Sequence, residues 1–233
     1  GWTAEEWDIW TAGVEGSSAY RWWADWIPTP EGQRWCYNKR WEACRVVEAM
    51  ISQWGLRALQ AGEGVVDVGG DPGFVAAELL RENIPVTVVD PAFGASGKSD
   101  PQTSEILRLY RQFEGTQFRL IRAPLNRAFV HDPKHRRILR GASAMVSLYP
   151  DEATDNCLYF SAAFDLRTVL MPCNECQRYF PSHNPTYEGF VQQCLKDDAK
   201  YSRVFRNAPM TREHVKDTPF CKVILQRTPV GEC

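Results

Sequence analysis

The residues with the clearest chemical pattern lie at positions 65–74, in the stretch VVDVGGDPGF. An acid, Asp67, stands inside an apolar run that predicts a buried strand. Three glycines follow it: Gly69, Gly70 and Gly73. Glycines at a strand end let a ligand approach the backbone, because they carry no side chain. Their spacing is not the dinucleotide G-x-G-x-x-G, and Pro72 removes an N–H that a pyrophosphate would use. The pattern therefore favours a ligand without phosphates.

A second acid, Asp90, ends the strand predicted at 85–90. A carboxylate there can accept hydrogen bonds from both hydroxyls of a ribose. S-adenosylmethionine (SAM) joins a ribose to a cationic amino-acid end, which Asp67 would attract. We therefore expect a SAM pocket at Asp67, Gly69, Gly70, Gly73 and Asp90. The alternative for the glycines is a tight turn that only packs a helix on a strand.

Three further side chains lie where a reacting group would sit. Tyr149 ends the strand predicted at 142–149, Asp151 follows it, and Cys173 follows the next strand at 167–172. A methyl transfer needs positioning and sometimes a base. Tyr149 is a weak base near neutral pH, since its reference pKa is ~10. Asp151 has a second interpretation, because it precedes a predicted helix and would cap it.

These motifs resemble those of class I SAM-dependent methyltransferases. The pattern D-x-G-x-x-P-G after a first strand, with an acid closing the second, resembles motif I and its partner in that family. The Pro-Gly form is similar to that of RNA ribose 2′-O-methyltransferases, whose lysine and acid set we cannot place here. The resemblance covers residues 38–227 and is strongest at the motifs. It implies a Rossmann-like fold that binds SAM.

The fourth predicted strand ends in SLYPDEATDN, which resembles a poorly characterised group of methyltransferase-like proteins from algae and protists. That group has His-Pro-Asp-Glu-Ala-Thr at this point, where this chain has Tyr149 in place of the histidine. It has Pro-Cys-Cys after the fifth strand, where this chain has Cys173 followed by Asn174. Both differences fall where the resemblance places the chemistry.

Two functions from different classes follow. One is a SAM-dependent methyltransferase with an unknown acceptor. The alternative is a catalytically inactive scaffold subunit of a large organellar complex, ribosomal, respiratory or photosynthetic. SAM binding by the purified chain would separate the two.

Strands alternating with helices position these residues. Such alternation predicts a doubly wound, mostly parallel α/β sheet of about six or seven strands, with a Rossmann-like order. The strands are expected at 64–68, 85–90, 116–123, 142–149, 167–172 and 220–228, and helices at 38–54, 72–82, 152–164 and 186–196. The ligand site should lie at the carboxyl ends of the strands.

The N-terminal part differs in composition from the rest. All nine tryptophans lie between Trp2 and Trp54. We therefore divide the chain into an irregular, Trp-rich arm at 1–37 and a methyltransferase-like domain at 38–233. So many indoles between Trp2 and Trp26 favour contact with a partner in a large assembly, or a lipid-facing rim. The alternative is a lid folded over the sheet.

Residues 105–140 hold nine basic and three acidic residues, although the whole chain has a net charge of −2. This basic stretch could bind RNA or another acidic partner, or it could be a solvated helical face. No apolar run approaches the ~20 residues of a membrane-spanning helix.

The eight cysteines suit buried or pocket thiols, because the chain is long enough to build its own core. Cys173 and Cys176 form a C-x-x-C that could bind zinc only with His183 and Cys194, and we expect no metal. The chain begins at Gly1, so we expect a processed form or a fragment. We expect an intracellular protein, with an organelle left open.

Overall fold

The computed structural model describes residues 29–71, 73–91, 110–173, 186–214 and 223–229. Their strands form one sheet in the order β3-β2-β1-β4-β5-β7-β6, with β6 and β7 antiparallel to their neighbours. The predicted doubly wound, mostly parallel sheet is confirmed, and its order reverses beside β1. The strands are β1 (Val65–Val68), β2 (Val86–Val89), β3 (Phe118–Ile121), β4 (Ala144–Leu148), β5 (Thr168–Met171), β6 (Thr211–His214) and β7 (Val223–Arg227).

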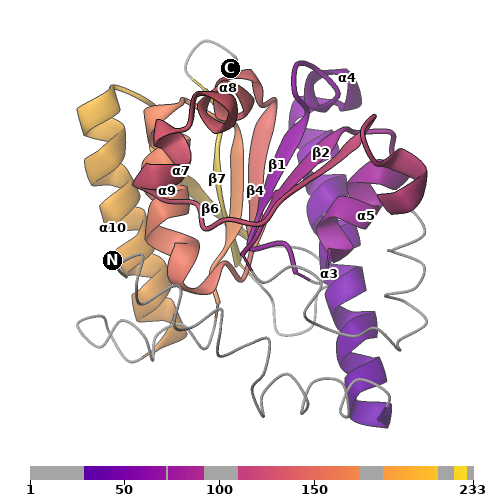
Figure 1. Ribbon diagram of the computed structural model, residues 1–233. Coiled ribbons are helices and arrows are strands. Elements are labelled where there is room, and N and C mark those ends of the chain that lie inside the picture. Colours follow the sequence, from indigo (N-terminus) through magenta and orange to yellow (C-terminus); the bar gives the residue numbers. More distant parts are fainter. Residues whose placement is uncertain (1–28, 72, 92–109, 174–185, 215–222, 230–233) are drawn as a thin grey trace.

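Helices cover both faces of this sheet (Figure 1). One face carries α3 and α5, and the other carries α7, α9 and α10. The helices are α3 (Pro30–Trp54), α4 (Leu56–Leu59), α5 (Phe74–Arg81), α7 (Arg127–His131), α8 (Pro133–Gly141), η1 (Asp151–Ala153), α9 (Thr154–Ala163) and α10 (Tyr187–Phe205). None of the described helices is long and apolar enough to cross a bilayer.

Helix α3 begins earlier than the sequence pattern predicted. Its first residue is Pro30 rather than Asn38, and the Thr29 hydroxyl caps it by accepting a hydrogen bond from the Gly32 amide at 3.2 Å. The run Thr-Pro-Glu at 29–31, within the segment predicted to be irregular, provides a cap, an N1 proline and a first-turn acid. The helix therefore crosses the predicted boundary between the arm and the domain. It ends at Trp54, as predicted, and Gly55 is its C-cap.

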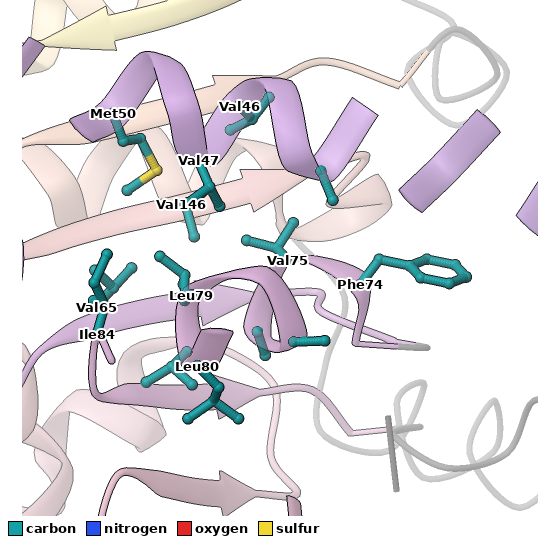
Figure 2. Close-up of a cluster of buried hydrophobic side chains, with 14 of the residues drawn as sticks. Val46, Val47, Met50, Val65, Phe74, Val75, Leu79, Leu80, Ile84 and Val146 are labelled. Atoms are coloured by element: carbon teal, nitrogen blue, oxygen red, sulfur yellow. The ribbon is translucent and has the colours of Figure 1, made fainter. Parts of the chain in front are cut away.

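The core between α3, α5 and the sheet is shown in Figure 2. Val46, Val47 and Met50 of α3 face Val75 and Leu79 of α5, and all are buried. This packing fixes α3 across the strand face that carries Asp67 and holds its amino-terminal half near the carboxyl ends of the strands. Residues of the first helix can therefore reach the candidate site.

The opposite face is built around α9 and α10. Helix α10 extends nine residues beyond its predicted end. The apolar pattern stopped early because the second half of the helix buries polar groups instead of apolar ones. Asp198 of this half forms a fully buried ion pair with Arg227 of β7. Strand β6 was not predicted, since its sequence Thr-Arg-Glu-His is polar and mostly exposed.

Candidate functional site

The predicted pocket residues converge at the carboxyl ends of β1 and β2. The Asp71 amide after the glycine pair donates a hydrogen bond to Asp90 Oδ2 at 3.0 Å. Asp67 and Asp90 are both buried and interact electrostatically. The glycine loop and the two acids that the sequence proposed are thus brought together.

The three glycines are required by close approach and by backbone conformation. Gly69 has φ +67°, and a Cβ there would lie 3.2 Å from Cα of Pro150. A Cβ on Gly70 would lie 2.7 Å from Asp67 Oδ2. Gly73 has φ +97° and precedes α5 as its N-cap. A side chain at any of these positions would distort the loop. The same glycines therefore form the tight turn and leave the backbone open to a ligand.

Asp67 is 1% exposed, and neither of its carboxylate oxygens has a hydrogen-bond partner in the described part of the chain. Burial, and next the charge of Asp90, raise its pKa to about 7. The Ala76 amide opposes this shift, although its geometry falls short of a hydrogen bond. An unpartnered buried carboxylate is costly unless a ligand supplies a donor or a positive charge.

Tyr110 supports the glycine loop, and sequence reasoning missed it. Its hydroxyl donates to the Gly73 carbonyl oxygen at 2.8 Å, and its ring stacks on Phe118 with centroids 4.0 Å apart. Tyr110 follows a charged stretch without a strand pattern, so its place beneath the loop has no local signal.

Tyr149, predicted as a catalytic residue, contacts two residues of α3. Its hydroxyl donates to Glu42 Oε2 at 2.8 Å, and Lys39 Nζ lies 3.4 Å from its ring centroid. Lys39 Nζ also pairs with Glu42 at 3.2 Å, and Glu42 is only 3% exposed. Burial, followed by the Glu42 carboxylate, raises the pKa of Tyr149 well above its ordinary value. Tyr149 is therefore a neutral hydrogen-bond donor rather than a phenolate base.

Lys39 and Glu42 carry no motif, and sequence reasoning did not propose them. Their i, i+3 spacing predicts that they share one face of a helix, but it does not predict which residue that face contacts. The contact arises because Tyr149 adopts φ +56° after β4 and because α3 packs along the sheet. The same helix places Trp35 edge-on to Phe74, with ring centroids 6.3 Å apart.

Cys173, the third predicted catalytic residue, lies near Tyr149 after β5. Its thiol contributes to the raised pKa of Tyr149 and of Tyr187, with burial the larger cause for both. It is a partly buried cysteine. The structure thus brings Tyr149 and Cys173 to one edge of the sheet. The glycine loop lies beside them, because Pro150, which follows Tyr149, packs closely against Gly69.

Asp151 lies in the 3-10 turn η1, directly before α9. The residue in the N-cap position of α9 is Ala153, which makes no side-chain cap. The capping role predicted for Asp151 stays a prediction, and η1 separates this residue from the first residue of α9. Its catalytic role stays a prediction.

Within the ranges that the structure describes, no three potential ligands gather into a metal site. Of the C-x-x-C set, Cys176 and His183 lie outside those ranges, and Cys194 is buried on α10. The tryptophans from Trp2 to Trp26 also lie outside them.

Comparison with known proteins gives a fold. No family model and no curated protein matches the chain. Magnesium protoporphyrin IX methyltransferase from Synechocystis PCC 6803, solved with bound SAH, is 15% identical with a TM-score of 0.53, and the match covers 95% of this chain and 99% of that one. The 1,6-didemethyltoxoflavin-N1-methyltransferase of Burkholderia thailandensis is 14% identical at a TM-score of 0.46, covering 98% and 92%. The first of these shows that the chain has the Rossmann-like fold of that methyltransferase.

Proposed function

We propose that this protein is a SAM-dependent methyltransferase whose acceptor is unknown. The observation that carries the proposal is the buried Asp67 carboxylate, which lacks a hydrogen-bond partner in the described chain and stands beside the glycine loop and Asp90. A cationic ligand with a ribose suits two adjacent acids at a switch point better than a phosphate would. The structure that shares the fold holds SAH, the demethylated form of SAM.

SAM would supply a methyl group on a positively charged sulfur. Asp67 would attract the cationic amino-acid end, and Asp90 would accept hydrogen bonds from ribose hydroxyls. Gly69, Gly70 and Gly73 keep the backbone open for the ligand. These roles use the chain's residues for binding and orientation, which provide most of what methyl transfer requires.

The acceptor side of the site would be formed by Tyr149, Cys173 and Asp151 at the ends of β4 and β5. Glu42 strengthens the case for Tyr149, because its buried carboxylate can receive the phenol proton as Tyr149 takes one from an acceptor. Lys39 compensates the Glu42 charge in this resting arrangement. The histidine of the resembling group is thus replaced by a residue that has its own proton acceptor.

Calorimetry of the purified chain with SAM tests the proposal. We expect binding at micromolar levels, and we expect Asp90→Ala to weaken it by ~1–3 kcal/mol through lost hydroxyl contacts. Glu213→Ala, on the exposed strand β6, is the matched control and should bind normally. Absence of both heat and thermal shift at millimolar SAM would contradict the proposal and favour a noncatalytic scaffold.

A further inference from the structure

A second concave surface lies along the edge strand β3, and one of its lining residues, Tyr110, also supports the glycine loop. It is a cavity of about 750 Å³, a size typical of ligand sites. It runs from the residues before β1 and β2 along β3 to Arg122. Its lining includes Glu63, Pro85, Arg111, Gln117, Phe118 and Arg122. We call it the β3 groove.

The β3 groove has a basic rim that continues onto α8. Arg111 and Arg122 are exposed, and no described residue forms an ion pair with either. Glu63 links Arg119 of β3, at 3.2 Å, to Arg137 of α8, at 3.7 Å. The groove and α8 therefore form one surface.

The chain segment that supplies most of this surface is strongly basic, although Glu63 and Glu114 also line the groove. Residues 110–141 contain eight basic and two acidic side chains, whereas the whole chain has a net charge of −2. The rest of the chain consequently carries an excess of eight negative charges. One of the two acids, Asp132, is occupied in capping α8 through the Lys134 and His135 amides. A polyanion would be attracted to this side and repelled elsewhere.

The groove also offers a specific hydrogen-bond acceptor. Gln117 Oε1 is buried and has no partner in the described part of the chain, which favours a ligand with an N–H donor. Phe118, Leu120 and Pro85 add apolar surface. A nucleic-acid base could donate an N–H to Gln117 and pack on the apolar side chains, while its phosphate backbone contacts the arginine rim.

A peptide that pairs with β3 as an additional strand is a poorer occupant of the groove, although β3 is an edge strand. Its free edge is short, and the Gly115 amide already donates to the Phe118 carbonyl oxygen at 3.2 Å. Few main-chain groups remain for an incoming peptide. The charge pattern then decides the class of ligand.

We propose that the β3 groove binds single-stranded nucleic acid, with a base against Gln117 and phosphates on Arg111, Arg119, Arg122 and the α8 residues Lys134, Arg137 and Arg140. The groove lies along β3 from the amino ends of β1 and β2, whereas Asp67 faces the carboxyl ends. The proposal therefore stands independently of methyl transfer.

Fluorescence anisotropy with a labelled single-stranded RNA of about 12 nucleotides tests it on the full chain. Affinity should fall steeply between about 50 and 200 mM salt, and Arg111→Ala/Arg122→Ala should reduce it by roughly tenfold with a shallower salt dependence. Gln117→Leu should reduce it by about fivefold without changing the salt slope, since it removes a neutral hydrogen bond. Lys196→Ala/Lys200→Ala, on the exposed face of α10, is the matched charge control and should bind as the wild type does.

Three results would overturn the proposal. The first is equal RNA affinity of the wild type and the double arginine variant. The second is equally effective competition by polyglutamate, which would mean a general polyanion surface. The third is displacement of the RNA by AMP at similar concentration, which would mean a mononucleotide site. Circular dichroism verifies folding, and Arg111→Gln/Arg122→Gln replaces the alanine pair if that pair does not fold. Asp90→Ala should leave RNA binding unchanged, which separates this test from that of SAM.

Discussion

At the scale of single residues, Asp67 combines two properties that folding alone does not favour. It is buried in β1, and its charge lies beside that of Asp90. Burial raises the pKa of Tyr110 and of Cys157, and the negative charge of Asp67 adds to the rise in both. Arg81 opposes the rise for Tyr110. No described basic side chain acts on Asp67 in this way, so a cationic ligand would stabilise its carboxylate.

The raised pKa of Asp67 leads to a stability prediction. Between its ordinary pKa of 3.8 and the folded value of about 7, the folded state holds a proton that the unfolded state has released. The free energy of unfolding should therefore fall across this range and then level off. Asp67→Asn should remove the dependence and gain on the order of 1–4 kcal/mol relative to wild type between about pH 5 and pH 8. Urea denaturation at both pH values measures it, and parallel pH profiles would contradict the prediction.

Tyr149 shows how a strained backbone serves a contact. Its positive φ is uncommon for an aromatic residue, and it directs the phenol to Glu42. Tyr149→Phe should lose a hydrogen bond to a charged group, so we expect the free energy of unfolding to fall by about 1.5–3 kcal/mol. Tyr159→Phe, whose ring packs edge-on to Tyr201, is the control and should change stability less. A Tyr149→Phe variant as stable as wild type would show that the contact does not stabilise the fold.

At the scale of elements, strands were predicted better than helix ends. Apolar runs identified β1, β2, β4 and β5 because strands buried on both faces are continuously hydrophobic. The second half of α10 was missed because Asp198 and Ser202 occupy its buried face. Their partner Arg227 is distant in sequence, so no local pattern announces the pairing.

This polar contact between α10 and β7 gives the third prediction. Asp198→Asn should leave the Arg227 guanidinium buried without its counter-charge, at a cost of about 3–5 kcal/mol. Urea denaturation near neutral pH measures the loss. Asp197→Asn, one residue earlier and only partly buried, should cost far less. Equal losses for the two variants would show that the buried pair is not what anchors β7.

At the scale of the whole molecule, strand order along the chain brings the predicted pocket residues together, whereas the surroundings of Tyr149 depend on helix packing. Parallel strands bring Asp67 and Asp90 to one edge whatever the helices do. Glu42 and Lys39 reach Tyr149 only through the packing of α3 on the sheet, which spacing does not reveal. A sequence pattern therefore placed the two acids and the three glycines together, but it did not reveal the α3 side chains that contact Tyr149.

The structure also sharpens the expectation for the Trp-rich arm. Trp35 was assigned to the arm, yet it belongs to α3 and packs on Phe74. If Trp2 to Trp26 contact a partner, limited proteolysis of the isolated chain should cut before Thr29 and stop there, because α3 is held by the core from Cys36 onward.

Mass spectrometry of the resistant fragment measures where cleavage stops. The fragment should keep Trp35, Trp41 and Trp54, while the intact chain shows the red-shifted emission of indoles in water. The fragment's own emission should be bluer, since its three indoles are at least partly buried. Resistance of the whole chain, with blue-shifted emission from all nine tryptophans, would instead mean that the arm covers its own domain and that no partner is needed.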